Sequence, residues 1–531
     1  MPPHSNVQRL LLHIEILGNR LPHPTMLFIY LCGFILACSG LAALFGASTV
    51  HPITGETVVA KSLLSAEGLR EILSNGVKNF TGFAPVGTVL VAVMGIGVAE
   101  HSGLLSVALR ALVVNASQKM TTFIVVLAGV LSSLAADTGY VVLVPLAGLV
   151  FLAAGRHPVA GIAAAFAGVS GGYSANLLIG PLDAVLAGIS TEAATLVQPD
   201  YVVSAAGNYY FIVASTFLIA IVGTYVTERW ICPLLGEYKT DNLLKAQEPD
   251  QTKGQTKNQK NTQAENSDNS QYISQHISQA DRKALKAVGL FSVVFIFLLL
   301  ACVLPQDGIL RNPDTGSLLR SPFISGIVMI IAVYAALCGW LFGKVSGRFD
   351  SSRDFILGME SAMVTMASYL VLMFFAAQFV NWFSWSQLGT ISAIKGAQFL
   401  QLLDPNAGIL LICFMLLAAF INLLVGSASA KWALLGPIFV PMLLLAGISP
   451  EATQVAYRIG DSSTNIITPL MPYFGVVVAF VQKYDKDAGI GTLLAIMLPF
   501  SLIFLVSWSL LLAAWIVLGM PLGPGAPVFV G

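Results

Sequence analysis

Charged residues are scarce in this sequence. Only 10% of the 531 residues are Asp, Glu, Lys or Arg, whereas 56% are hydrophobic, and the formal net charge is +0. A water-soluble domain usually carries about a quarter charged residues, so the composition excludes most soluble folds. The balanced charge provides no basic surface for nucleic acid. We therefore predict a membrane protein that lies in a lipid bilayer and has no nucleic-acid partner.

Cysteine is scarce too, and histidines with metal-ligand spacing are lacking. The six cysteines lie in or beside apolar runs without a C-x-x-C pattern, which is typical of small buried side chains rather than of disulfides or metal ligands. The seven histidines are scattered along the chain, without the spacing of a metal site. The sequence therefore predicts no cofactor.

Apolar runs of about twenty residues, enough to cross a bilayer core of about 30 Å, recur along the chain. The first is too long for a cleaved signal peptide, so we expect a retained helix. The predicted fold class is an all-α polytopic membrane protein with about nine transmembrane helices. They are expected at roughly 26–46, 84–113 (broken), 158–190 (broken near Gly171–Pro181), 207–231, 285–304, 322–343, 355–382, 450–480 (broken near Asp461–Pro469) and 490–519.

Two further apolar segments, roughly 120–155 and 407–447, are interrupted by the small polar stretches SSLAADTGY and GSASAKW. Each is either one kinked span or a pair of short helices that turns back on itself. Backbone leaves helical geometry at membrane depth only where it is buried in protein or lines a watery cavity. We favour two re-entrant hairpins.

One hairpin and the span after it occur twice. A shift of 292 positions brings Gly155, Pro158 and Gly168 onto Gly447, Pro450 and Gly460 without a gap, and Tyr140 onto Trp432. Three residues of slippage later, Ser174-Ala175-Asn176 matches Ser463-Thr464-Asn465. Chance similarity of two apolar stretches is the alternative, but matched proline and glycine positions speak against it. Repeated, interrupted hydrophobic segments indicate the binding site of a secondary transporter.

Lysine and arginine predict the orientation, because they gather in cytoplasmic loops. Their distribution places the two hairpins on opposed sides, as an inverted repeat. Residues 1–240 form the first half with hairpin 1 (~120–155), and 283–531 form the second half with hairpin 2 (~407–447). The Gln- and Asn-rich segment 241–282 between them is predicted to be a disordered cytoplasmic linker. Residues 66–80 are predicted to form an amphipathic helix on the outer surface.

Few charges fall inside apolar runs, and such charges are functional candidates because they are costly at bilayer depth. They are Asp137, Asp183, Glu192, Lys431, Arg458 and Asp461, of which Glu192 and Asp183 could instead lie at helix ends. Asp461 opens the polar run DSSTN, whose oxygens suit Na⁺ or a proton site. Asn465, its repeat partner Asn176, and Asn422 are further candidate ligands. A structural ion pair of Asp461 with Arg458 or Lys431 is the alternative.

Two other motifs have competing interpretations. Trp432 and Tyr140 follow the hairpin tips and suit stacking on a planar substrate, although a packing role is as plausible. The stretch GVSGG (168–172) satisfies G-x-S-x-G, but that hydrolase motif needs a strand-to-helix elbow and a histidine partner. It lies in a predicted helix break, so we predict that the chain is not an enzyme.

Long stretches of the chain resemble the p-aminobenzoyl-glutamate transporter (AbgT) family, most closely its MtrF-like branch. The likeness covers nearly the whole length and is carried by LPHP (21–24), VKNFTGFAPVGTVL (77–90), GRHPVAGIAAAFAGVSGGYSANLL (155–178), GSASAKW (426–432), GPIFVPMLLLAG (436–447), YRIGDSSTNIITPL (457–470) and LGPG (522–525).

The resemblance implies a homodimeric carrier of the bacterial inner membrane with nine spans and two opposed hairpins. It implies a substrate site with Asp183, Ser429, Trp432, Pro450, Arg458 and Pro469, and a sodium site with Asn422 and Asp461. The coupling ion is expected to be H⁺ or Na⁺. Lys431 beside Trp432 could tighten anion binding or replace the charge of that ion.

We therefore predict an ion-coupled secondary transporter of p-aminobenzoyl-glutamate and related folate-pathway aromatics, which exports them and sulfonamide antimetabolites. Arg458 and half-helix N-termini suit a carboxylate, Trp432 suits the aryl ring, and Asp461 suits the ion. An importer of p-aminobenzoyl-glutamate is the alternative, and an anion channel is a more remote one.

Overall fold

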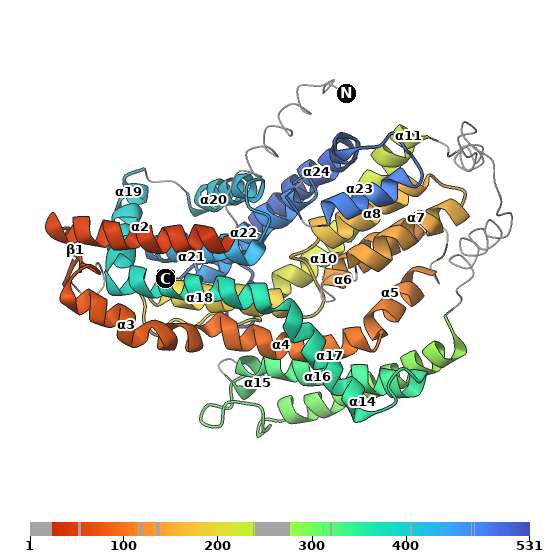
Figure 1. The fold of residues 1–531 in the computed structure, drawn as a ribbon, viewed down its shortest axis with the longest axis horizontal. Coiled ribbons are helices and arrows are strands. Elements are labelled where there is room, and N and C mark those ends of the chain that lie inside the picture. The colour runs from red at the N-terminus through yellow and green to blue at the C-terminus, as the bar shows by residue number, and fades with distance from the viewer. Residues whose placement is uncertain are drawn as a thin grey trace, which may run out of the picture.

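Figure 1 shows the fold in a computed structural model of the chain. The structure describes residues 24–50, 52, 55–114, 117, 120–133, 139–236, 238, 277–318, 321–403, 406–468, 470–471 and 473–530. Within these ranges the regular secondary structure is helical, apart from two isolated bridges and one antiparallel pair of strands, β1 (Ser48–Val50) and β2 (Thr57–Val59). Asp137, Pro469 and most of the predicted linker, 241–276, lie outside the described residues.

Eight helical stretches in the described residues are long and apolar enough to cross a membrane. They are α2 (Pro24–Leu44), α3 and α4 together (Ala66–Thr81 and Ala84–His101), α10 with η4 and α11 (Tyr209–Val226, Thr227–Ile231 and Cys232–Leu235), α14 (Gln279–Val303), α16 (Ile327–Ser346), α18 (Ala367–Trp385), α21 (Ala428–Leu445) and α24 (Ile490–Val517). Two spans predicted as broken, 158–190 and 450–480, consist of shorter helices instead.

Six of the other described helices are short. They are α5 (Leu104–Val114), α9 (Pro181–Ala194), α15 (Pro322–Ser325), α17 (Ser352–Thr365), α19 (Leu388–Leu403) and α23 (Phe474–Gln482). The predicted break within 84–113 is confirmed, because α4 ends at His101 and Gly103 has a φ of +80°. Helix α14 begins at Gln279, inside the end of the predicted linker, because the Ser278 side chain accepts a hydrogen bond from the Asp281 amide at 3.0 Å.

Each predicted hairpin consists of two helical arms. The first has α6 (Thr121–Ser132) and then η2 (Gly139–Leu143) with α7 (Val144–Ala153), and the second has α20 (Ala407–Asn422) and α21. Helix α6 has 12 residues, about 18 Å at about 1.5 Å per residue, so it is too short to span a bilayer core. Its partner α7 packs against α8, and α20 packs against α22.

The two copies of the repeat fold alike where they enter their broken spans. Gly155 and Gly447, with φ of +70° and +82°, end the second arms of the two hairpins. The amide of the residue after each glycine donates back into the preceding helix, to Phe151 O at 2.8 Å and to Leu443 O at 2.9 Å, which is the Schellman cap. Pro158 and Pro450 then begin α8 (Pro158–Phe166) and α22 (Pro450–Asn465).

A second pair of equivalent glycines lies where each broken span packs against its hairpin. A Cβ added at Gly168, in η3 (Ala167–Gly171), would overlap the carbonyl oxygen of Val126 in α6. A Cβ added at Gly460, in α22, would overlap the carbonyl oxygen of Met415 in α20. The missing side chains allow the backbones to approach closely, as at other small-residue helix contacts in membranes.

Gly168→Ala and Gly460→Ala are therefore expected to destabilise the protein by about 1–3 kcal/mol each, because overpacked sites force the backbone to shift. The measurement is the thermal unfolding midpoint in detergent. Gly33→Ala in α2 is the matched control, since no atom lies within 4 Å of a Cβ added there. An unchanged midpoint in both repeat variants would contradict the close contact.

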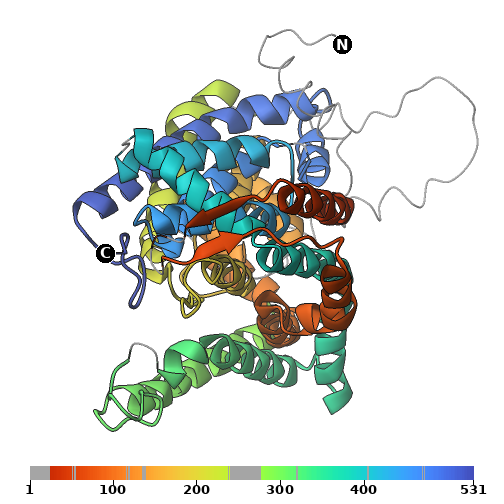
Figure 2. The same cartoon turned by 90° about the vertical axis from the view of Figure 1, so that its left-hand side faces the viewer.

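The two halves of the chain interleave rather than form separate bodies. Helix α21 of the second half packs against α9 of the first, and α18 packs against α2. Figures 1 and 2 show α14, α15 and α16 along one side of the molecule, where α16 packs against α4. Helix α14 exposes large apolar side chains such as Leu290 and Phe297, which suits contact with lipid.

Candidate functional site

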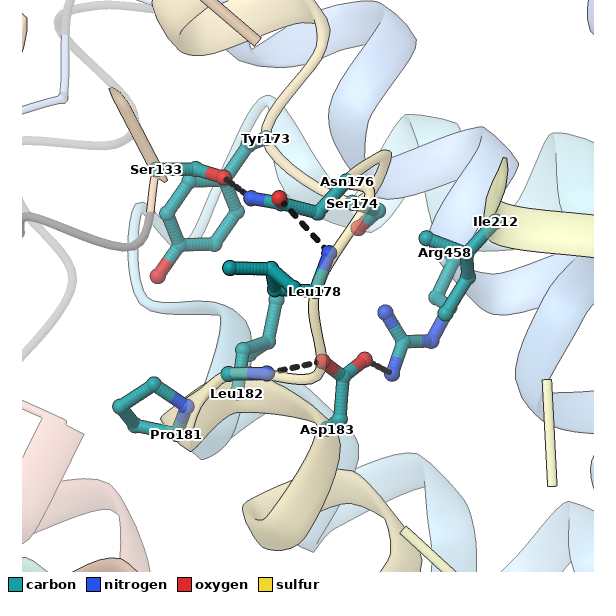
Figure 3. Close-up of a pocket in the computed structure, with 11 residues that line it drawn as sticks. Ser133, Tyr173, Ser174, Asn176, Leu178, Pro181, Leu182, Asp183, Ile212 and Arg458 are labelled. Carbon is teal, nitrogen blue, oxygen red and sulfur yellow. Dashed lines mark hydrogen bonds and ion pairs between the residues drawn. The ribbon is translucent and has the colours of Figure 1, made fainter. Parts of the chain in front are cut away.

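A small pocket lies where the break of the first repeat copy meets α22 of the second. It lies between the end of α6, the loop from η3 to α9, α10 and α22 (Figure 3). Its volume of about 20 Å³ is room for one water molecule and far too little for a benzoyl-glutamate. The lining residues are Ser133, Tyr173, Ser174, Asn176, Leu178, Gly180, Pro181, Leu182, Asp183, Ile212 and Arg458.

A buried ion pair forms one wall of this pocket. A terminal nitrogen of Arg458 donates to Asp183 Oδ1 at 2.6 Å, and both side chains are less than a tenth exposed. The other carboxylate oxygen of Asp183 accepts from the Gly180 amide at 2.7 Å, at the start of α9. The helix start therefore fixes the carboxylate, which in turn orients the guanidinium.

Arg458 is only partly used by this pair. Its Nε has no hydrogen-bond partner among the described residues, and Figure 3 shows its other terminal nitrogen pointing into the pocket. A guanidinium presents a planar fork of donors that matches a carboxylate. These donors face the pocket, so an anionic group would bind to them in a state in which the pocket is wider.

The loop between η3 and α9 is held from both repeat copies. Asn176 donates to Ser133 Oγ at 2.8 Å, and its side-chain oxygen accepts from the amides of Leu177 and Leu178 at 2.8 and 3.2 Å. The Ser174 amide donates to Ser462 Oγ of α22 at 3.1 Å. Asn176 thus shapes the pocket wall, and its oxygen is occupied by its own loop.

A second polar cluster lies between hairpin 2 and α22. It involves the end of α20, the first turn of α21 and the middle of α22. Lys431 Nζ forms an ion pair with Asp461 Oδ1 and donates to Asn422 Oδ1. The three side chains are at most 1% exposed. Helix α22 continues past Asp461 to Asn465, so Asp461 lies inside a helix rather than at the predicted break.

Neighbouring polar groups complete this cluster. The side-chain nitrogen of Asn422 lies 2.6 Å from Asp461 O, 2.8 Å from Thr464 Oγ1 and 3.0 Å from Asn465 Oδ1. The Tyr457 hydroxyl lies 2.5 Å from Ala428 O and 3.4 Å from Asp461 Oδ1. The Asn422 amide is therefore oriented by its acceptors, with its oxygen turned toward Lys431.

A sodium ion, which the resemblance implies at Asn422 and Asp461, does not fit this arrangement. Two of the side-chain oxygens that would bind it, Asp461 Oδ1 and Asn422 Oδ1, face the ammonium group of Lys431. The other carboxylate oxygen, Asp461 Oδ2, has no hydrogen-bond partner among the described residues, but an ion beside it would lie next to that ammonium group.

Trp432 is a packed core residue in this conformation. It is 0% exposed, and its indole Nε1 donates to Leu186 O and Ser190 Oγ of α9, each at 3.1 Å. Its ring lies 4.6 Å from that of Tyr457. Trp432 does not line the pocket here, so stacking on a substrate requires a different arrangement of α9 and hairpin 2.

The other predicted residues lie around these clusters. Ser429 Oγ lies 3.4 Å from Ser427 Oγ at the start of α21, and Pro450 begins α22 and is buried. Tyr140 stacks on Tyr473 with ring centroids 4.5 Å apart. Ser170 of the GVSGG stretch is buried, with its hydroxyl 3.1 Å from the sulfur of Met471.

Sequence reasoning missed several members of the site. Tyr457 directly precedes the candidate Arg458, and Tyr173 directly precedes the repeated stretch Ser174-Ala175-Asn176. Ser133 lies within the polar stretch that interrupts hairpin 1. No sequence pattern pointed to Ser190, because a serine inside an apolar helix is common. It gains importance only through its bonds to Trp432 and to Gln454 Oε1, the latter at 3.1 Å.

Known proteins match this chain along nearly its whole length. A sequence profile of the AbgT putative transporter family matches residues 9–264 and 256–530. The p-aminobenzoyl-glutamate transport protein of Escherichia coli (strain K12) is 36% identical over 525 residues, which cover 99% of this chain and 98% of that protein.

Two solved structures share the fold. The Alcanivorax borkumensis YdaH transporter, described as having an unusual topology, is 52% identical with a TM-score of 0.85, over 95% of this chain and all of that one. Neisseria gonorrhoeae MtrF, described as illuminating a class of antimetabolite efflux pumps, is 46% identical with a TM-score of 0.87, over 98% of this chain and all of that one.

These likenesses decide three predictions. They confirm the predicted all-α polytopic membrane fold. They make the chain a multi-pass membrane protein. The relatives are transporters, in agreement with the prediction that the chain is not an enzyme.

Proposed function

Because the chain belongs to the AbgT family of putative transporters, we propose that it is an ion-coupled secondary transporter of p-aminobenzoyl-glutamate and related folate-pathway aromatics. We propose further that it works as an antiporter in a bacterial inner membrane and exports these compounds and sulfonamide antimetabolites. The name of the Escherichia coli relative supports the substrate, and the description of MtrF supports export.

The main observation in favour of an anionic substrate is that the guanidinium of Arg458 has donors left free by Asp183. It is buried, held from one side by Asp183 and open toward a polar pocket on the other. A carboxylate of the substrate would bind there by charge-assisted hydrogen bonds. The aryl ring would then reach Trp432, which α9 separates from the pocket through Leu186 and Ser190.

The pocket size supports alternating access. At about 20 Å³ the site is closed to substrate, so binding and release require the elements around it to move. Its walls come from both repeat copies, and rocking of one repeat against the other is the common mechanism in carriers built from inverted repeats. Asp461, one turn after Arg458 on α22, is the residue through which the driving ion is proposed to act.

A homodimer is part of this proposal and rests on the resemblance to the family. The expected result is a detergent-solubilised particle with the protein mass of two chains, measured by light scattering coupled to size exclusion. A monomer that transports at the full rate after reconstitution would contradict it.

The test of the function is flux of labelled p-aminobenzoyl-glutamate in proteoliposomes, with Na⁺ and pH gradients imposed separately. We expect one gradient to drive accumulation against the substrate gradient. If the substrate concentration inside the vesicles never exceeds the concentration outside under either gradient, ion coupling is rejected. The direction of the productive ion gradient decides between export and the alternative, import.

Counterflow separates a carrier from an anion channel. After it releases labelled substrate, a carrier can bind unlabelled substrate and return with it. Unlabelled substrate inside the proteoliposomes should therefore accelerate the uptake of labelled substrate. A channel shows no such acceleration.

Trp432→Phe is expected to slow transport of aryl substrates while the protein stays folded. Phenylalanine keeps most of the buried ring but lacks the indole N–H that bonds Leu186 O and Ser190 Oγ. An aromatic stacking contact contributes about 1–3 kcal/mol, so Trp432→Ala should weaken binding further. Trp432→Ala should also destabilise the fold by about 3–5 kcal/mol, since it empties a fully buried site. Wild-type substrate affinity in Trp432→Phe and Trp432→Ala, measured by calorimetry, would make Trp432 a packing residue only.

A further inference from the structure

We propose that the ammonium group of Lys431 is a built-in cation of hairpin 2, which occupies the position between Asn422 and Asp461 and keeps Na⁺ from binding there. This inference concerns ion binding alone and does not depend on which solute is carried.

The contacts of Lys431 are those of a bound cation. Its Nζ faces Asp461 Oδ1 and Asn422 Oδ1, one charged and one neutral oxygen from two different helices. The nitrogen of the Asn422 amide is turned away, toward Asp461 O, Thr464 Oγ1 and Asn465 Oδ1. This orientation leaves the amide oxygen for a cation, and the cation present is covalently part of α21.

The charge balance of the Lys431 cluster also disfavours a sodium ion beside the ammonium group. Arg458 pairs with Asp183, and Lys431 pairs with Asp461, so each buried pair is neutral. The nearest further titratable group of the cluster is Tyr457, which contributes a hydroxyl oxygen. A sodium ion added here would be a buried charge without a counter-ion, and such charges are strongly unfavourable.

Removal of the amine should therefore create a sodium site. Lys431→Ser leaves Asp461 without its partner and opens space lined by the oxygens of Asn422 and Asp461. Lys431→Met removes the charge but fills the space, so it is the matched control. Lys431→Ser with Asp461→Asn removes the charged ligand as well.

The experiment measures thermal unfolding of the purified full-length protein without substrate, in NaCl or in N-methylglucamine chloride of equal ionic strength. Wild type is expected to unfold at the same midpoint in both salts. The midpoint of Lys431→Ser should rise with the logarithm of the Na⁺ concentration, as for any ligand that binds only the folded state. Lys431→Met and the double variant should not respond.

Two results would overturn the proposal. One is a sodium-dependent midpoint in wild type that Asn422→Ala abolishes, and the other is a folded Lys431→Ser protein with no response to Na⁺. If Lys431→Ser does not fold, binding of radioactive sodium to wild type and to Asn422→Ala decides, because the proposal requires equal binding. A failure of p-aminobenzoyl-glutamate flux would leave these measurements unchanged, so the two proposals fail separately.

Discussion

Asp461→Asn is expected to abolish gradient-driven accumulation of p-aminobenzoyl-glutamate while exchange of substrate at equilibrium partly survives. The substitution keeps the shape of the side chain and removes the charge that pairs with Lys431. Accumulation requires that the driving ion and the substrate be coupled, whereas exchange requires only that the loaded carrier reorient. The measurement compares both fluxes in the same proteoliposomes.

The same substitution should destabilise the protein by about 3–5 kcal/mol, because it leaves Lys431 as a buried charge without its partner. The double variant Lys431→Gln with Asp461→Asn removes both charges and should recover much of this loss. If the double variant also recovered gradient-driven transport, Asp461 would be a structural counter-ion and the coupling role would be wrong. Asp350→Asn, at an exposed residue just before α17, is a control expected to transport normally.

Arg458→Gln should lower the affinity for p-aminobenzoyl-glutamate by at least about thirtyfold. Truncating one partner of a charge pair that is buried on binding costs about 2–5 kcal/mol, and the pair lost here is the one between Arg458 and the carboxylate of the substrate. Arg458→Lys can keep an ion pair with Asp183 but not the planar fork, so we expect an intermediate affinity. Titration calorimetry on the purified variants measures the substrate affinity of Arg458→Gln and of Arg458→Lys.

Arg353→Gln is the control for this series, since Arg353 is exposed on α17 and does not line the pocket. Arg458→Gln also leaves the Asp183 carboxylate buried without its cation, so a lower unfolding midpoint accompanies the loss of affinity. Wild-type affinity in a folded Arg458→Gln protein would show that the substrate carboxylate binds elsewhere.

The breaks and the repeat could be predicted from the sequence because proline and glycine act locally. Pro158 and Pro450 begin their helices, and Gly155 and Gly447 end the preceding ones with positive φ. These residues specify backbone geometry whatever surrounds them. Their recurrence at one fixed shift therefore predicted the equivalent helix ends and helix starts of both copies.

The pairing of the buried charges could not be predicted, because it depends on helix packing. Arg458 and Asp461 lie three residues apart on one helix, and the sequence is compatible with a pair between them or between Asp461 and Lys431. In the structure Arg458 reaches α9 and Asp461 reaches α21, so α22 presents its two charges to different neighbours. The sequence carries no information on which helix lies against which side of α22.

The predicted helices also left out α19 and the strand pair. Residues 388–403 carry Lys395 and several small polar residues, too few apolar ones for a span, and they form a helix against α21 and the strands. Strands of three residues each are too short to produce an alternating pattern. Tertiary contacts decide such segments.

The closed pocket has a consequence for inhibitors. On the proposed substrate class, a cavity of about 20 Å³ leaves no room for a benzoyl-glutamate analogue beside Arg458, so the analogue would bind a state in which the pocket is wider. Its apparent dissociation constant then equals the intrinsic one divided by the fraction of open molecules. A rigid analogue with a bulky substituent on the ring would bind one open form and arrest the cycle there. Its affinity would report how often the carrier opens.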